Sequence, residues 1–142
     1  MRVQQAPFDL AAELSGFSQN SAAGAQVTFK GIVRGDGGLH MLEIEHYPAM
    51  TQKALEEIEA QARRRWDLED CLILHRHGRL QVGEDIMMVA TAAKHRSDAF
   101  LAAEFLMDYL KSRAPFWKKE HFADGERWVE ARSSDEAALK RW

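Results

Sequence analysis

A proline placed directly after a long apolar helix is the strongest constraint in this sequence. Apolar side chains recur at three- and four-residue steps from Phe100 to Leu110, which predicts a helix with one buried face. Pro115 lacks a backbone N–H and disfavours helical geometry at Ala114, so we expect the helix to end there. Residues 116–122 then have the pattern of a β-strand. The chain is therefore predicted to turn sharply from a helix into a strand.

Cations lie on both arms of this corner, with Lys111 and Arg113 before the proline and Lys118 and Lys119 after it. Cations are favourable near a helix C-terminus because the free carbonyl groups there carry partial negative charge. One interpretation is therefore a capped helix end with solvated lysines. The other is an anion pocket in which Lys111 and Lys118 face each other across the corner.

Length and composition limit what surrounds the corner. The 142 residues suffice for one hydrophobic core but not two, so we expect one domain over residues 1–142. The net charge, 19 − 22 = −3, gives no general attraction to nucleic acid or to an anionic membrane. The apolar runs are short, and no basic segment followed by an apolar one resembles a signal peptide, which predicts a cytoplasmic protein without a membrane span.

Hydrophobic periodicity predicts strands that arrive in adjacent pairs between helices. Such an order is typical of an α+β domain with a largely antiparallel sheet. Gly31 interrupts its strand and predicts a bulge, and Gly35 to Gly38 predicts a mobile loop. Ser97 is expected to cap the long helix, and Ser133 with Glu136 to form a capping box. The expected elements are helices at 7–14, 50–66, 97–114 and 133–142, and strands at 25–34, 40–47, 71–77, 85–93, 116–122 and 127–132. The apolar faces expected for two of them are Met50, Ala54, Leu55, Ile58, Ala62 and Trp66 in the 50–66 helix, and Leu42 and Ile44, alternating with Glu43 and Glu45, in the 40–47 strand.

Several kinds of chemistry lack the residues they need. His75 and His77 share a strand face, but no Cys or third His completes a metal site. Cys71 is the one cysteine, which excludes an intrachain disulfide, and it lies in a buried-strand pattern. No nucleophile elbow or glycine-rich phosphate loop is present. The 117–128 segment, with two tryptophans and several cations, leaves single-stranded nucleic acid binding as an alternative.

What remains is a set of cations without a matching acid–base dyad. Each lies at the end of a predicted element, where side chains from different elements converge, and such a set suits a small anionic ligand such as a phosphate. A lysine crowded by other cations can lose its proton and act as a general acid, general base or nucleophile. The alternative for each residue alone is a solvated or salt-bridged side chain. The set consists of Arg34, His95, Arg96, Lys111, Lys118 and Arg132.

These residues belong to blocks that come in one order along the chain. Together the blocks closely resemble the large, catalytic subunit of molybdopterin synthase. The resemblance runs from about Val27 to Trp142, and the first 25 residues match it weakly. The blocks are Phe29-Lys30-Gly31-Ile32-Val33-Arg34, Glu45-His46-Tyr47-Pro48, His75-Arg76-His77-Gly78, Gly83-Glu84, His95-Arg96-Ser97, Met107-Asp108-Tyr109-Leu110-Lys111, Arg113-Ala114-Pro115-Phe116-Trp117-Lys118-Lys119-Glu120 and Arg127-Trp128-Val129.

The resemblance implies an α/β hammerhead fold and a homodimer at the centre of a heterotetramer. A small ubiquitin-like sulfur-carrier subunit docks on each large subunit, and the thiocarboxylate at its C-terminal Gly-Gly supplies the sulfur. The family converts cyclic pyranopterin monophosphate into molybdopterin by inserting two sulfurs as a dithiolene. No metal or cofactor is implied for the large subunit itself.

Residue by residue, the resemblance implies that Lys111 contacts the carrier tail and assists sulfur transfer, and that Lys118 acts on the substrate. Other positions follow in the same way: Arg34, His95, Arg96 and Arg132 would build the pocket for the pterin and its phosphate, partly across the dimer, and Phe29 and Met107 would line the approach of the tail. Two departures, the short glycine-rich loop after Arg34 and Ala49 in place of a glycine, concern loop geometry. A non-catalytic module that binds a ubiquitin-like tail is the alternative function.

Overall fold

The strands form two four-stranded sheets in the computed structural model, which describes residues 1–142. The first sheet has the order β1-β4-β6-β2 and the second the order β5-β3-β7-β8. All pairs are antiparallel except β1 with β4, which confirms the predicted α+β class. The strands are β1 (Arg2–Gln4), β2 (Ala25–Ile32), β3 (Met41–His46), β4 (Leu68–Arg76), β5 (Gly78–Gln81), β6 (Asp85–Ala93), β7 (Phe116–Phe122) and β8 (Gly125–Trp128), and the helices are α1 (Leu10–Gly16), η1 (Asp36–Gly38), α2 (Pro48–Arg65), α3 (Arg96–Ser112) and α4 (Ser133–Leu139).

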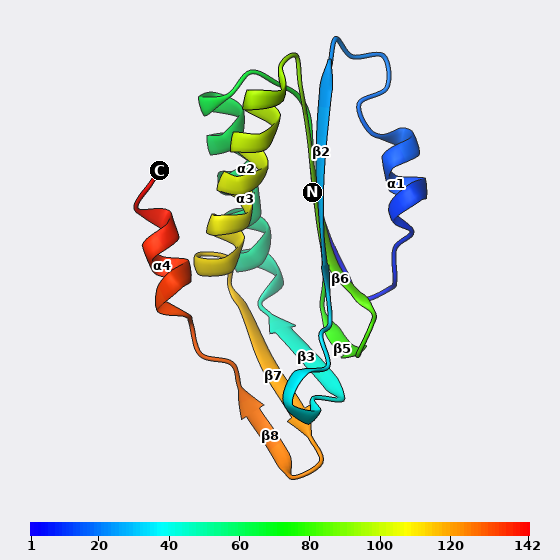
Figure 1. Ribbon diagram of the computed structural model, residues 1–142, viewed down its shortest axis with the longest axis vertical. Coiled ribbons are helices and arrows are strands. Elements are labelled where there is room, and N and C mark those ends of the chain that lie inside the picture. The colour runs from blue at the N-terminus through cyan, green and yellow to red at the C-terminus, as the bar shows by residue number, and fades with distance from the viewer.

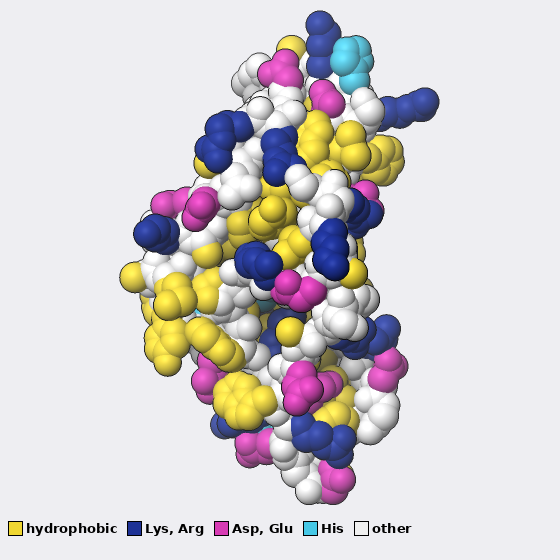
Figure 2. Space-filling view, turned by 90° about the vertical axis from the view of Figure 1, so that its left-hand side faces the viewer, with side chains coloured by type: hydrophobic (Ala, Val, Ile, Leu, Met, Phe, Trp, Pro, Cys, Tyr) yellow, Lys and Arg dark blue, Asp and Glu magenta, His cyan; other side chains and the backbone are white.

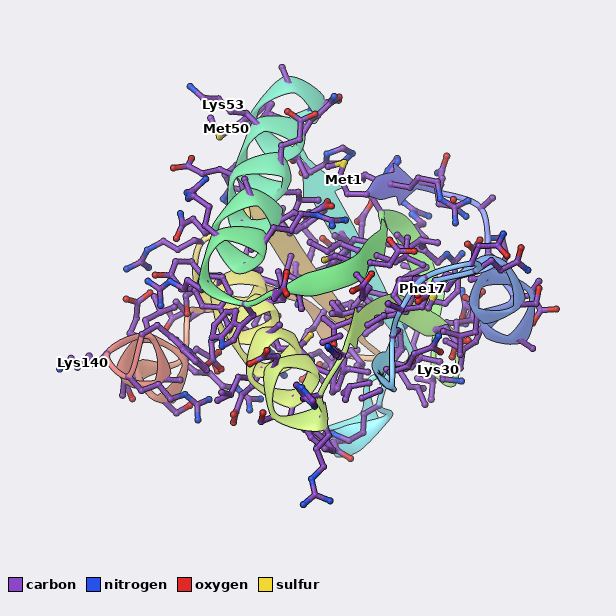
Figure 3. The ribbon with its side chains drawn as sticks, turned by 90° about the horizontal axis from the view of Figure 1, so that it is seen from above. Met1, Phe17, Lys30, Met50, Lys53 and Lys140 are labelled. Carbon is purple, nitrogen blue, oxygen red and sulfur yellow. The ribbon has the colours of Figure 1, made fainter.

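The first sheet is covered on both faces. Helices α2 and α3 lie on one side of it and α1 on the other (Figures 1 and 3). Alternate side chains of β6 point to opposite faces of the sheet. Val89 packs with Phe105 beneath α2 and α3, and Met88 packs with Phe17 beneath α1. This double burial explains why residues 85–93 read as a nearly continuous apolar run.

The second sheet lies below the first and continues from it (Figure 1). The sequence predicted one strand at 71–77, but the chain leaves the first sheet after Arg76 and enters the second as β5. Gly78 makes this change of direction with φ +90°, a conformation that favours glycine. The short strand β1, also not predicted, lies alongside the end of β4, and His77 donates its backbone N–H to the Gln4 carbonyl at 3.0 Å.

Two predicted helix caps are wrong. Helix α3 begins at Arg96, so His95 takes the N-cap position that was expected for Ser97. Helix α4 has Arg132 at its N-cap and Ser133 inside its first turn, so Ser133 and Glu136 stand one position too late for a capping box. The Glu136 carboxylate instead pairs with Arg113 at 2.7 Å.

Helix α2 also differs from its predicted pattern. Met50, expected on the apolar face, is 56% exposed and points away from the sheet (Figure 3), whereas Thr51 is fully buried. The Thr51 hydroxyl lies 3.0 Å from Nδ1 of His46, so a polar side chain is accommodated because its hydrogen bond is satisfied. Leu55, Ile58 and Ala62 continue the buried face as predicted.

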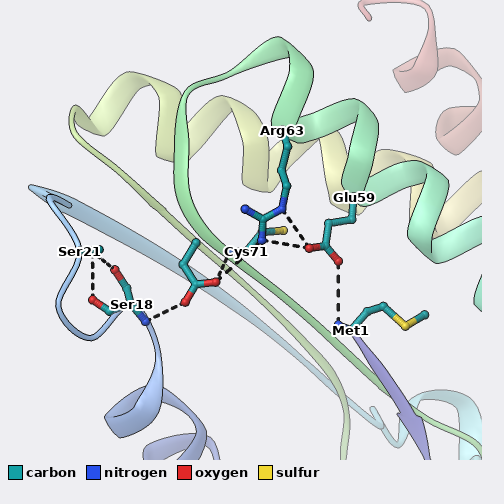
Figure 4. A network of polar contacts seen from close by, with 7 residues as sticks. Met1, Ser18, Ser21, Glu59, Arg63 and Cys71 are labelled. Carbon is teal, nitrogen blue, oxygen red and sulfur yellow. Dashed lines mark hydrogen bonds and ion pairs between the residues drawn. The ribbon is translucent and has the colours of Figure 1, made fainter.

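A polar network ties the N-terminal part of the chain to the sheet (Figure 4). The Asp70 carboxylate accepts the backbone N–H of Ser18 at 2.9 Å and lies 3.9 Å from Arg63. Arg63 also binds Glu59 at 3.0 Å, and Glu59 lies 3.9 Å from the amino group of Met1. The connection after α1 and the start of β1 are thereby linked through Arg63, which lies between the Asp70 and Glu59 carboxylates.

Helix α4 packs against α3 and is fixed there by Trp142. The indole Nε1 donates to Asp108 at 2.7 Å, and the ring lies edge-on to Trp66 and Phe105 in the main core. Arg141 adds an ion pair with Glu104 at 2.9 Å. No helix in the chain is long and apolar enough to span a membrane.

Candidate active site

The predicted corner is present. Helix α3 ends at Ser112, and the Arg113 N–H still donates to the Tyr109 carbonyl at 2.7 Å. The chain then turns, with the Phe116 N–H donating to the Ala114 carbonyl at 2.8 Å, and β7 begins. Lys111 is therefore in the last turn of the helix.

Lys118 extends from the inward face of β7. It lies opposite Ile44, which is only 1% exposed, and it shares its strand face with Phe116, which packs against the core. Burial lowers the pKa of Lys118 to about 8, and the nearby charges of Lys111 and Arg132 act in the same direction. Lys111 and Arg132 are thus close enough to Lys118 to act on its pKa, and the three form the lysine cluster; Asp135 is the carboxylate that opposes their effect.

A buried histidine that was not predicted as a site residue lies beside this cluster. His75, at the end of β4, is 5% exposed, and its ring stacks on Phe116 with centroids 3.8 Å apart and planes 13° apart. Burial lowers its pKa to about 3, with a smaller contribution from the charges of Lys118 and Lys111. The sequence analysis considered His75 only as a metal ligand, because the contact between β4 and β7 joins segments 41 positions apart.

The other three predicted substrate residues are not among the charges that act on the pKa of Lys118. Arg34 is exposed and pairs with Asp36 at 2.5 Å in the turn before β3. His95 and Arg96 stand at the start of α3 and Lys111 in its last turn, which separates them by about 22 Å along the helix axis. Figure 1 shows these two ends of α3 at the top of the molecule and at its middle. One copy of the chain therefore gathers Lys111, Lys118 and Arg132 but not Arg34, His95 and Arg96.

The two residues predicted for the tail channel are both on accessible surface. Phe29 is 41% exposed on β2, the edge strand of the first sheet, and Met107 is half-buried on α3 at the margin of the core. The face that includes α4 carries hydrophobic, basic and acidic side chains side by side (Figure 2). On the outward face of the second sheet, a hollow of about 250 Å³ is lined by Glu45, His46, Tyr47, Trp117 and Trp128.

Comparison with known proteins places this chain in a family. The family model described as MoaE protein matches residues 3–113. A molybdopterin synthase catalytic subunit from Cereibacter sphaeroides is 61% identical over 99% of this chain and 97% of the relative. The chain belongs to the MoaE family of molybdopterin synthase catalytic subunits. The resemblance found in the sequence is thereby confirmed.

Solved structures of MoaE relatives have the same fold. The MoaE protein of Burkholderia ambifaria superimposes with a TM-score of 0.86 at 55% identity, over 99% of this chain and 95% of that one. The molybdopterin synthase structure from Staphylococcus aureus gives a TM-score of 0.83 at 31% identity, over 92% and 98%. The family model ends at residue 113, but the longer alignments continue through β7 and α4, where Lys118 and Arg132 lie.

Proposed function

We propose that this MoaE-family chain converts cyclic pyranopterin monophosphate into molybdopterin. Two sulfurs would be inserted as a dithiolene, each delivered as the C-terminal thiocarboxylate of a small ubiquitin-like carrier. The observation that carries this proposal is the inward-facing Lys118 amine, whose pKa lies at about 8 beside Lys111. With that pKa, about a tenth of the Lys118 side chains are neutral at pH 7, so the amine exchanges protons in the physiological range.

The sulfur source follows from the state of the one thiol. Cys71 is 6% exposed and packs in the main core. Burial raises its pKa to about 12, so almost no thiolate exists at neutral pH. A sulfur-inserting enzyme with such a cysteine needs sulfur from another molecule. A thiocarboxylate on a glycine-ended tail is thin enough to reach the corner and anionic enough to be held by Lys111.

The remaining predicted residues define a larger pocket in this proposal. Arg132 already belongs to the lysine cluster, while His95 and Arg96 lie about 22 Å from Lys111 along α3. They would therefore complete the pocket from a second copy in a homodimer, and Arg34 would bind phosphate after releasing Asp36. Phe29 and Met107 would line the path of the carrier tail. The cytoplasmic location expected from the sequence stays a proposal, which cell fractionation tests.

The test supplies thiocarboxylated carrier and cyclic pyranopterin monophosphate and measures dithiolene formation. Lys118→Arg keeps a cation but cannot become neutral, so we expect product formation to fall by about two orders of magnitude. Lys111→Ala should weaken tail binding and slow transfer. Lys119→Ala is the matched control, because Lys119 points to the opposite face of β7 and pairs with Glu126 at 3.3 Å.

Wild-type rates in Lys118→Arg and Lys111→Ala would remove the proposed roles. Carrier binding without any product from the unaltered chain would instead support the alternative, a module that only binds a ubiquitin-like tail.

A further inference from the structure

His75 has one hydrogen-bonding nitrogen engaged and one free. Its Nδ1 lies 2.8 Å from the carbonyl oxygen of Arg76. A carbonyl only accepts, so Nδ1 carries the hydrogen, and in the neutral ring Nε2 is left with a lone pair. Nε2 has no partner among the hydrogen bonds of the chain, while the stack on Phe116 fixes the plane of the ring. The imidazole therefore presents a fixed, unused acceptor.

The strand geometry determines what lies beside that acceptor. Phe116 and Lys118 are two residues apart on β7, so their side chains leave the same face of the strand. Phe116 stacks on His75, and the charge of Lys118 lowers the pKa of His75, so the two side chains lie near each other although no hydrogen bond joins them in this arrangement of the chain. The other charged or titratable groups around the two side chains are Lys111 on α3, Arg132 and Asp135 at the start of α4, and His46 on β3.

We propose that His75 is a positioning residue for the Lys118 amine, with Nε2 accepting one N–H of Lys118. This inference rests on the proposed function. A neutral amine has two N–H bonds and one lone pair, so a hydrogen bond to Nε2 turns the lone pair away from β4 and toward the substrate. His75 keeps its own proton on Nδ1 throughout, and Lys118 alone gains or loses a proton.

The proposal predicts an unusual combination of effects when the acceptor is removed. An acceptor stabilises an ammonium group more than an amine, so its loss lowers the pKa of Lys118 and leaves more free amine at neutral pH. The orientation of that amine is lost at the same time. We therefore expect kcat to fall about tenfold or more while KM stays unchanged, although the reactive form of Lys118 has become more abundant.

Three substitutions of His75 distinguish the role of Nδ1 as a donor from the role of Nε2 as an acceptor. His75→Asn keeps a donor for the Arg76 carbonyl but has no group in the place of Nε2, and His75→Phe keeps only the stack. Both should lose kcat and shift the titration of Lys118 to lower pH. His75→Gln places an amide oxygen near the position of Nε2 and should retain activity within about threefold. His77→Asn is the control, because His77 contacts His46 and is not among the charges that act on Lys118 or His75.

The measurements are product formation against pH and NMR titration of the lysine side chains in the complex with the carrier. Wild-type kcat and an unchanged Lys118 titration in both His75→Asn and His75→Phe would overturn the proposal. If these variants fold poorly, ¹⁵N NMR of the unaltered chain decides instead: the Nε2 resonance of His75 should move with a midpoint near 8 as Lys118 titrates. A constant Nε2 resonance would contradict the hydrogen bond between Lys118 and His75. If the unaltered chain forms no product, the result contradicts the proposed function but not this hydrogen bond.

Discussion

Lys118 and Lys119 are neighbours in sequence, yet the pleat of β7 gives them opposite surroundings. Lys118 faces inward, opposite Ile44, and burial lowers its pKa to about 8. Lys119 faces outward, pairs with Glu126 at 3.3 Å and lies over the Trp128 ring at 4.5 Å. The difference teaches that the side of the strand on which a lysine lies determines what surrounds its amine. Four changes test or refine this comparison.

The largest expected effect is on catalysis. Lys118→Ala should lower the rate of dithiolene formation about a thousandfold, because in the proposed function it removes the amine that exchanges protons with the substrate. Lys119→Ala should leave the rate within about twofold. Steady-state kinetics with saturating carrier compare the two variants. Equal losses in both would show that the two faces of β7 do not differ in function.

The second effect concerns stability against pH. The pKa of Lys118 is about 8 in the fold and 10.5 in an unfolded chain, so the unfolded chain binds more protons between these values. The free energy of unfolding should therefore rise as the pH increases from about 8 to 10.5. Lys118→Met should remove this dependence and stabilise the protein at pH 7 by about 2 kcal/mol.

Urea unfolding at a series of pH values measures this dependence. Lys119→Met is the matched control and should leave the slope in place. An unaltered slope in Lys118→Met would mean that Lys118 is not the titrating group.

A smaller effect is expected at the carboxylate near Lys118. Asp135 favours the charged form of Lys118, so Asp135→Asn should lower the pKa of Lys118 further and move the rising limb of the pH–rate profile to lower pH. Asp124→Asn, in the β7–β8 turn where Asp124 pairs with Arg127 at 3.3 Å, is the control and should leave the limb unchanged. A shift to higher pH in Asp135→Asn would contradict the assigned charge arrangement.

The smallest effect is expected at the outward lysine. Glu126→Ala breaks the ion pair with Lys119, in which the Glu126 side chain is 56% exposed. An ion pair with one exposed partner contributes little because water screens the exposed charge, so the free energy of unfolding should change by less than about 0.5 kcal/mol. Thermal unfolding measures the change. A loss of several kcal/mol would indicate that the outward face of β7 is more constrained than its exposure suggests.

The sequence was sufficient for features that depend on neighbouring residues. Pro115 ended a helix and began a strand as predicted, and the alternation of Leu42 and Ile44 with Glu43 and Glu45 identified the buried face of β3. The bulge at Gly31 is also present, as a shift in register against β6. Each of these follows from local backbone chemistry or side-chain period.

Features that depend on distant segments were missed. Strand β5 was not predicted, because residues 78–81 are a strand only when β3 pairs with them. Met50 is exposed although it was expected on the apolar face, and Thr51 is buried beside it because His46 satisfies the Thr51 hydroxyl. His75 offered no local sign of its position, since only the stacking of Phe116 brings it to the lysines. Among the substrate residues, the chain itself brings only Arg132 to the lysine pair.

Gly78 has a consequence for how the two sheets behave mechanically. A Cβ there would stand 2.8 Å from Nε2 of Gln5, and φ is +90°, so any other residue would strain the bend and displace the Gln5 side chain, which follows β1. The chain from β4 through β5 is thus a continuous connection from the first sheet to the second sheet, which contains β3 and β7. A more flexible bend at Gly78 would let the second sheet, which carries Lys118, move relative to His75 in the first sheet while the strand pairing within each sheet stayed intact.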